Sequence, residues 1–415
     1  MSSDIKTKAL YDQYVLNTYG RFPVALTRGE GRRVWDSEGK EYLDFGAGIA
    51  VTLLGHSHPE IQEELHRQAG QLTHVSNLYY VDQQGRLAKS IVDRLLPGKC
   101  FFCNSGAEAN EALFKLARRF GHEEGRYEVI TMNGSFHGRT LASIAATGQD
   151  KVRQGFGPVT PGFKHVPLND LKALENTLTE ATAAVLLEGV QGEGGIHTAD
   201  GDYLLALRKI CHDRKILLLW DGIQCGYFRT GEFHSFQRIL GAPVPEGFFP
   251  DAIAMAKSVA NGLPMGAVWI DDRYTELLGP GSHGTTFGGT PLVSAVALKV
   301  LEIVEREQLA VHATERGNQL KSELIGLQQR LPNVIKEVRG LGLMLGIELH
   351  PEVTIDASDQ RPLSLQIVEA LRANGLLSIP SGLHVFRLLP ALNTTKSEAD
   401  RALEIIQNTL LSLTR

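Results

Sequence analysis

The sequence predicts an α/β protein in which a large domain with a mostly parallel central sheet is joined to a smaller α+β domain. From about residue 85, short apolar runs alternate with segments of helical periodicity; the runs are YEVITM, AAVLLE, KILLLWD and DAIAMAK. Strands that are apolar on both faces are typical of a parallel sheet covered by helices on both sides. The length of 415 residues is sufficient for two domains.

Helical periodicity is clearest in EALFKLARRFG, DYLLALRKICHDR and PLVSAVALKVLEIVERE. The two ends of the chain mix strands and helices. RRVWDSEGKEYLDF indicates two strand runs around a turn, VRGLGLMLGIEL a strand pair, SIPSGLHVFRLLP a further strand, and SEADRALEIIQNTLLSL a closing amphipathic helix. We therefore expect residues 1–50 and 301–415 to form the smaller domain and residues 51–300 to form the larger one.

Composition argues against several classes of partner. The net charge of -5 is mild and the basic residues form no long run, which disfavours nucleic acid and anionic membranes. No apolar stretch approaches the ~20 residues of a membrane span, and MSSDIKTKALYDQY lacks the apolar core of a secretory signal, so a cytoplasmic protein is expected. Four cysteines are too few for a disulfide scaffold. Cys100 and Cys103 form a C-x-x-C without the second pair of a zinc site, so we expect no metal.

Charged residues stand at the ends of three predicted strands. Glu188 ends AAVLLE, Asp221 ends KILLLWD and Lys257 ends DAIAMAK. The loop after YEVITM adds Phe136, His137 and Arg139. Open parallel sheets bind ligands beyond the carboxyl ends of their strands, and a buried charge is costly unless it is paired. The sequence therefore predicts a shared cleft at this edge of the sheet.

A helix start follows the run FFC. Ser105 and Glu108 have the spacing of a capping box, with the helix expected from about Ala107. Gly106 allows close backbone approach, and the free N–H groups of a first helical turn form an anion site. An ordinary capped helix explains the same pattern without a ligand.

One cofactor requires an amine, a carboxylate and a phosphate cradle together. Pyridoxal phosphate forms a Schiff base with an amine, and a carboxylate keeps its ring nitrogen protonated. Lys257 can supply the amine, Asp221 the carboxylate, and the Ser105-Gly106-Ala107 turn the cradle. The lysine can also act as the base for a proton transfer. Taken alone, a lysine at a strand end is usually a solvated surface residue.

Motifs along nearly the whole chain resemble those of one family. In order they are NSGAEANEALFKLAR, FHGRT, EGVQGEGG, WDGIQCGYFRTG, AMAKSVANGLPMGA and HGTTFGGTPL. They resemble the class III pyridoxal-phosphate aminotransferases of the acetylornithine and ornithine type. The resemblance implies the aspartate-aminotransferase fold (fold type I of pyridoxal-phosphate enzymes), a smaller domain built from both chain ends, and a homodimer with shared active sites.

The resemblance implies cofactor roles residue by residue. Lys257 and Asp221 are the implied catalytic residues, as the Schiff-base lysine and the partner of the ring nitrogen. The other implied cofactor residues are Ser105, Gly106 and Ala107 at the phosphate, Phe136 and Ile223 on the two ring faces, Gln224 near the ring hydroxyl, His137 in a supporting position, and Thr286 reaching the phosphate of the neighbouring subunit.

Five residues are implied at the substrate. Glu193 and Arg387 resemble a switchable ion pair in which Arg387 binds the α-carboxylate of glutamate or 2-oxoglutarate and is otherwise neutralised by Glu193. Arg139 is implied to bind the carboxylate at the other end of the site, helped by Tyr19, because the planar guanidinium accepts a carboxylate bidentately. Glu188 either contacts the substrate or orients its loop.

The segments SNLYY and TYGRFP favour the acetylornithine branch of the family. The expected reaction transfers the terminal amino group of N-acetylornithine to 2-oxoglutarate, giving N-acetylglutamate semialdehyde and glutamate in arginine biosynthesis. The alternatives are transamination of another ω-amine (succinylornithine, ornithine or a lysine-pathway intermediate), and a pyridoxal-phosphate-binding protein with lyase, racemase, aminomutase or weak transaminase activity. A switchable ion pair favours the transaminases.

The chain departs from the family pattern at three places. Gly222 replaces an acidic residue after Asp221 and could leave Arg229 without a partner. Gly189 replaces a proline, and SVANGLPMG replaces a more glycine-rich stretch after Lys257. None of these changes removes a residue assigned to bond making.

Overall fold

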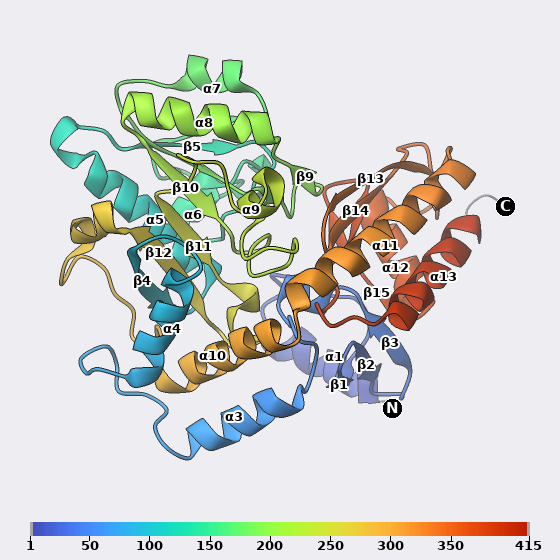
Figure 1. The fold of residues 1–415 in the computed structure, drawn as a ribbon. Helices are drawn as coiled ribbons and strands as arrows, with labels where there is room; N and C mark the ends of the chain where they lie inside the picture. The colour runs from blue at the N-terminus through green and yellow to red at the C-terminus, as the bar shows by residue number, and fades with distance from the viewer. Residues whose placement is uncertain (1–2, 413–415) are drawn as a thin grey trace.

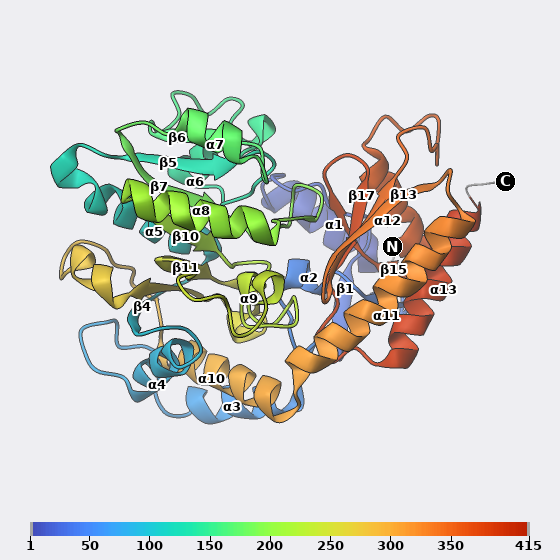
Figure 2. The ribbon, with the colours of Figure 1, turned by 45° about the horizontal axis from the view of Figure 1, so that its top comes forward.

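The computed structural model describes residues 3–412 and places a large sheet beside two smaller ones (Figures 1 and 2). The large sheet has seven strands in the order β4-β12-β11-β10-β7-β5-β6. Their bounds are β4 Gly98–Cys103, β5 Glu128–Met132, β6 Phe163–Val166, β7 Thr182–Leu187, β10 Leu217–Asp221, β11 Ala252–Met255 and β12 Gly266–Asp271. Neighbouring strands from β11 to β6 are parallel, whereas β12 runs antiparallel to both β11 and β4. The predicted α/β class with a mostly parallel sheet is confirmed.

Helices cover both faces of this sheet. Alternate side chains of one strand, such as Ala184 and Val185 of β7, belong to cores on opposite faces, and both are fully buried. One face is covered by α5 Gly106–Phe120 and α6 Leu141–Ala146. The other is covered by α3 Pro59–Ala69, α4 Asp82–Val92, α7 Leu171–Thr177, α8 Gly201–Arg214, α9 Ser235–Leu240 and α10 Pro291–Arg306. Double-sided burial explains why the strand sequences are continuous apolar runs.

The two smaller sheets combine segments from both ends of the chain. One sheet contains β1 Leu26–Glu30, β2 Arg33–Asp36, β3 Glu41–Asp44 and β15 Leu376–Leu377, with β15 parallel to β3. The other contains β13 Ile335–Leu341, β14 Met344–Leu349, β17 Val385–Leu388 and β16 Ile379–Ser381. Helices α11 Leu309–Arg330, α12 Leu363–Ala373 and α13 Lys396–Ser412 lie with these sheets, to one side of the large sheet (Figure 1).

The remaining elements are short or lie at the N-terminus. They are α1 Ser3–Tyr14, α2 Ala47–Ala50, the hairpin strands β8 Val190–Gln191 and β9 His197–Thr198, and the 3-10 turns η1 His122–Glu124, η2 Asp150–Val152, η3 Lys257–Ala260 and η4 Asp272–Leu278. Among residues 3–412, no helix has the length and apolar character needed to cross a membrane.

The observed elements follow the predicted runs, with one difference. SIPSGLHVFRLLP was expected as one strand but forms two antiparallel strands, β16 and β17, that reverse direction at Gly382. Gly382 has φ +59°, a left-handed conformation that glycine adopts without strain. After this reversal, Arg387 lies on the buried strand β17 and contacts the loop that contains Gly192.

Candidate active site

A cavity of about 400 Å³ opens at the carboxyl ends of β10 and β11. Eleven of the predicted site residues line it: Ser105, Gly106, Ala107, Phe136, His137, Arg139, Glu188, Asp221, Ile223, Gln224 and Lys257. Glu193 and Arg387 are not in its lining but are joined to it through Gln224. The volume lies within the range of ordinary small-molecule sites. The strand-end pattern therefore marks a true cleft.

Asp221 is the buried end of a polar network. It ends β10, is 2% exposed, and accepts hydrogen bonds at Oδ2 from Asn110 Nδ2 and His137 Nδ1, both at 2.8 Å. Its other oxygen, Oδ1, accepts the N–H of Ile223 at 3.1 Å. These three donors fix the orientation of the carboxylate. Sequence reasoning missed Asn110, because a single buried asparagine on an otherwise ordinary helix gives no periodic signal.

Glu188 lies next to this network, directly after β7. Its Oε1 accepts the N–H of Phe136 and its Oε2 the N–H of Gly192, each at 3.0 Å. Burial and the neighbouring charge of Asp221 raise the pKa of Glu188 to about 7, although His137 and the two N–H donors act in the opposite direction. Glu188 therefore holds its proton more readily than an exposed glutamate does.

Lys257 begins the 3-10 turn η3 and lines the cavity. Its φ of +49° is unusual for a residue with a side chain, and such strain is found preferentially at functional sites. Within residues 3–412, its ammonium has no hydrogen-bond or ion-pair partner. Burial lowers the pKa of Lys257, although the carboxylates of Glu193, Asp221 and Glu188 oppose this. A lysine with a lowered pKa is suited to nucleophilic and proton-transfer chemistry.

A strained turn lies beside Lys257. Residues 47–50 all have positive φ, from +47° to +68°, and the turn is followed by Val51, which lines the cavity. Asp44 Oδ1 accepts the N–H groups of Gly46 and Ala47, and Ser258 Oγ donates to the carbonyl of Ala50 at 2.8 Å. The two strained segments thus support each other, and no sequence motif identified Val51 or Ser258.

The start of α5, where the phosphate cradle is predicted, lines the cavity. Ser105 is the N-cap, and its Oγ accepts the N–H of Glu108 at 3.2 Å, which confirms the predicted helix start. The first-turn N–H groups of Gly106 and Ala107 have no acceptor within the helix and line the cavity. A Cβ at Gly106 would lie 2.9 Å from Ile223 Cδ1, so glycine keeps this wall free.

Arg387 and Glu193 form the expected ion pair. Arg387 is 1% exposed, and its Nη2 donates to Glu193 Oε1 at 2.6 Å. Its Nη1 donates to the carbonyl of Gly192 at 2.8 Å and to Gln224 Oε1 at 2.9 Å. Burial raises the pKa of Glu193, but the charge and hydrogen bond of Arg387 outweigh it and hold the pKa below its usual value. Gln224 thereby connects the ion pair to the cavity.

Arg139 is exposed, and its guanidinium lies 5.3 Å from the ring centroid of Phe136 at the cavity. Tyr19 and Thr286 do not line the cavity. Tyr19 is 72% exposed, with the Arg21 guanidinium 5.8 Å from its ring centroid. Thr286 is exposed in the loop before α10. Within one chain, therefore, neither residue is part of the pocket.

The glycines that depart from the family pattern leave room for buried side chains. A Cβ at Gly222 would lie 2.7 Å from His234 Nδ1, and one at Gly189 would lie 2.4 Å from both Ser235 Oγ and Trp220 Cζ2. His234 is fully buried, and burial lowers its pKa to about 3, so the ring is neutral. The neutral imidazole ring of His234 therefore occupies the space beside Gly222.

Arg229 is buried without a carboxylate partner in the described chain, as the change at Gly222 suggested. Its Nη1 donates only to the carbonyls of Leu343 and Pro390, and its Nε and Nη2 have no protein partner in this structure. Burial lowers the pKa of Arg229 to about 9. The guanidinium is therefore held at a substantial desolvation cost.

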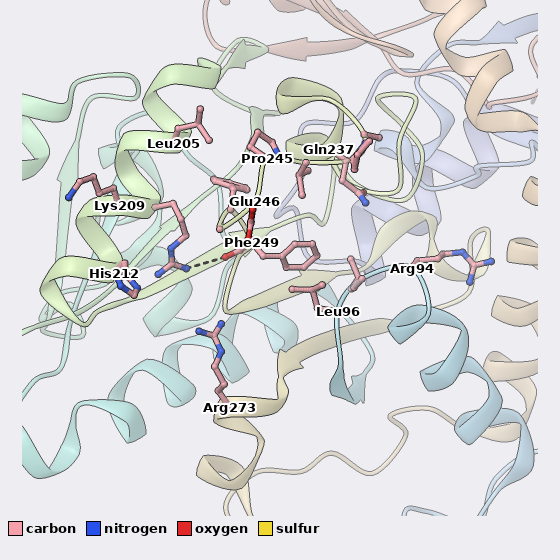
Figure 3. A pocket seen from close by; sticks show the side chains of 17 residues that line it. Arg94, Leu96, Leu205, Lys209, His212, Gln237, Pro245, Glu246, Phe249 and Arg273 are labelled. Carbon is pink, nitrogen blue, oxygen red and sulfur yellow. Dashed lines mark hydrogen bonds between the residues drawn. The ribbon is translucent and has the colours of Figure 1, made fainter.

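A larger cavity of about 840 Å³ lies near the amino ends of β10 and β11 (Figure 3). None of the predicted site residues lines it. Its lysine and arginines all have acidic partners: Arg94 with Glu305, Lys209 with Asp213, Arg208 with Asp251, and Arg273 with Asp251 and Asp271. No cation is left to attract an anionic ligand, so the smaller cavity is the candidate active site.

The cysteine pair offers no reactive thiol. Cys100 and Cys103 lie on β4, and burial raises the pKa of each to about 12. Both are free thiols. Such thiols are inert as nucleophiles at neutral pH.

The sequence matches the class-III aminotransferase family over residues 14–410. The chain belongs to the class-III aminotransferases. It is 45% identical over 412 residues to the acetylornithine aminotransferase of Thermosynechococcus vestitus, covering 97% of this chain and 96% of that protein. The acetylornithine aminotransferase of Methanocaldococcus jannaschii is 43% identical over 94% of both chains.

Solved structures of class-III aminotransferases have the same fold. The ornithine aminotransferase of Toxoplasma gondii matches with a TM-score of 0.90 and 32% identity, over 100% of this chain and 96% of that one. The acetylornithine aminotransferase of Elizabethkingia anophelis matches with a TM-score of 0.84 and 32% identity, over 99% and 100% of the two chains. The predicted family and fold type are confirmed, and the protein is a pyridoxal-phosphate-dependent aminotransferase.

Proposed function

We propose that this class-III aminotransferase transfers the terminal amino group of N-acetylornithine to 2-oxoglutarate. The observation that carries the proposal is the buried Arg387–Glu193 pair beside the Lys257 cavity. A transaminase must accept two unlike substrates in one site, and an arginine whose carboxylate partner is on a neighbouring loop can pair with either Glu193 or a substrate carboxylate. The acetylornithine aminotransferases at 40–45% identity support this choice of donor.

The donor set of the cavity fits pyridoxal phosphate. The amine of Lys257 has no competing partner, and the unused N–H groups of Gly106 and Ala107 suit a phosphate. Asp221 Oδ1 accepts only one backbone N–H and keeps a lone pair for a protonated ring nitrogen. We assign Phe136 and Ile223 to the two ring faces and Gln224 to the ring hydroxyl. When bound, the cofactor supplies an electron sink that stabilises negative charge on the substrate carbon losing its proton.

The chain's own groups supply binding and proton transfer. We assign Lys257 Nζ to hold the cofactor and, when free, to accept the proton released by the substrate carbon, because its lowered pKa favours the neutral amine. Asp221, fixed by Asn110 and His137, would hold the ring nitrogen through its carboxylate. Arg139 binds the carboxylate common to both half-reactions, and Arg387 binds the α-carboxylate of glutamate or 2-oxoglutarate.

We further propose a homodimer in which Thr286 of the partner subunit reaches the cofactor phosphate, and we assign Tyr19 to help Arg139 bind the substrate carboxylate. The exposure of Thr286 outside its own cavity is compatible with such a role. A stable, fully active monomer in sedimentation experiments would refute it. We also propose the expected division into residues 1–50, 51–300 and 301–415, with one adjustment. Because α10 runs without interruption to Arg306, the boundary between the second and third segments is placed at residue 307 instead of 301.

The test is the visible absorption of the purified holoenzyme as N-acetylornithine is added without a keto acid. We expect the cofactor band to change with N-acetylornithine and to return when 2-oxoglutarate is added. An unchanged band with this donor but a change with ornithine would favour the second candidate, an ornithine aminotransferase, which the match to the Toxoplasma gondii enzyme keeps open. No change with any amine would overturn the transaminase assignment.

A further inference from the structure

Glu188 holds two separate loops with one carboxylate. Its Oε1 accepts the N–H of Phe136, in the loop after β5, and its Oε2 accepts the N–H of Gly192, in the turn after β8. The side chain is only 4% exposed. A buried N–H that loses its acceptor is left without a hydrogen bond, which is unfavourable, so both loops depend on this carboxylate for their positions.

The two loops carry different parts of the site. The first presents Phe136 to the cavity and continues to His137, which donates to Asp221. The second contains the Gly192 carbonyl, which accepts Arg387 Nη1 at 2.8 Å and Ser381 Oγ at 2.9 Å. The next residue along the chain is Glu193. One loop thus belongs to the cofactor side of the cavity and the other to the ion pair.

We infer that Glu188 is a positioning residue that sets the spacing between the cofactor pocket and the Arg387–Glu193 pair. This inference rests on the proposed function, and it replaces the expected contact between Glu188 and substrate. Both carboxylate oxygens are committed to backbone N–H groups, and their acceptor strength is greatest when the group is ionised.

Several ionisable groups surround Glu188. Asp221 from β10 is the charged group that most strongly raises its pKa, whereas His137 lowers it, and Lys257 and the buried thiol of Cys225 also interact with it.

The variant Glu188→Gln tests the inference. The amide keeps the size of the side chain but offers one acceptor oxygen, so one of the two N–H groups faces an NH₂ donor instead. We expect hydrogen exchange of the Phe136 or Gly192 amide to accelerate about tenfold or more in the cofactor-free protein. In the holoenzyme we expect the cofactor Kd and the KM for 2-oxoglutarate each to rise about tenfold, with the KM for the amino donor changing less than about threefold.

A matched control is available in the same pair of loops. Gln191 Nε2 donates to the Asn133 carbonyl at 2.9 Å, so Gln191→Leu removes a second tie between these loops and leaves Glu188 in place. We expect it to lower stability without the kinetic pattern of Glu188→Gln. The inference fails if both variants give the same kinetic pattern, or if Glu188→Gln raises only the KM for the amino donor while amide exchange is unchanged, as a direct substrate contact requires. The exchange measurement needs no substrate, so it stands even if N-acetylornithine is not the donor.

Discussion

Replacing Arg387 by methionine should separate the two half-reactions of this aminotransferase. The guanidinium is 1% exposed and makes hydrogen bonds to Glu193, Gly192 and Gln224. In the half-reaction with 2-oxoglutarate, we assign two of its N–H groups to the α-carboxylate. In the half-reaction with N-acetylornithine, the α-amino group of the donor is acetylated and we assign no donor group to Arg387. Arg387 therefore stays paired with Glu193 in that half-reaction. The substitution Arg387→Met therefore removes a substrate contact from one half-reaction only.

The size of the effect follows from the contacts. A hydrogen bond to a charged group contributes about 1.5–3 kcal/mol, so two of them contribute about 3–6 kcal/mol. Since each 1.4 kcal/mol is about a tenfold change, kcat/KM for 2-oxoglutarate should fall roughly 10²- to 10⁴-fold. The half-reaction with N-acetylornithine loses only the support of Glu193 and Gln224, and its kcat/KM should fall by about tenfold or less.

Single-turnover kinetics of each half-reaction, followed through the absorption of the bound cofactor, measure the two losses separately. Arg387→Lys serves as a control that keeps the charge but not the planar pair of donors, and its loss with 2-oxoglutarate should be intermediate. Equal losses in both half-reactions, or a larger loss with N-acetylornithine, would refute the assignment of Arg387 to the α-carboxylate.

Three further predictions concern the residues around the site. Gly222→Ala should destabilise the protein by about 1–3 kcal/mol because its Cβ would lie 2.7 Å from His234 Nδ1, and adding His234→Ala should recover much of the loss in urea unfolding; an unchanged single variant would contradict this packing. Arg229→Met should stabilise the fold by about 1 kcal/mol or more in the same assay, because it removes a buried charge without a carboxylate partner; a large destabilisation would mean that the guanidinium is paired. The pKa of Glu188, raised from 4.5 to about 7, means that the folded state binds the proton more tightly, so the contribution of Glu188 to stability should fall as pH rises from about 4.5 to 7 and then level off. The difference in unfolding free energy between the wild type and Glu188→Gln should show this fall, and a difference independent of pH would argue against the raised pKa.

The strand-end residues were predictable because a parallel sheet brings its carboxyl ends to one edge. Glu188, Asp221 and Lys257 each directly follow or end a run that forms β7, β10 or β11. The shared chain direction of parallel strands therefore predicts their common location from the sequence alone. The N-cap at Ser105 was equally local, and its bond to the Glu108 N–H appears in the structure, although the Glu108 carboxylate accepts the N–H of Asn104 rather than that of Ser105.

Other features depend on contacts between distant segments and leave no local pattern. Asn110 faces Asp221 from α5, and nothing in the helix sequence distinguishes it from a residue packed in the core. The filling of the space beside Gly222 by His234 depends on how α9 begins, twelve residues later. Tyr19 was expected at the pocket from its motif, but in the single chain it is exposed and does not line the cavity.

The long sequence separations at Arg387 have a consequence for how this protein folds. Its three hydrogen-bond partners lie 195, 163 and 194 residues earlier in the chain. Closing such long loops is entropically costly and slow, so contacts of this kind form late. The residues of the cofactor pocket come mostly from one continuous stretch, from Asn104 to Met265. Ser105 and Lys257 in this pocket are comparably far apart in the chain, so a refolding chain should gain affinity for pyridoxal phosphate and recognition of 2-oxoglutarate together, late in folding.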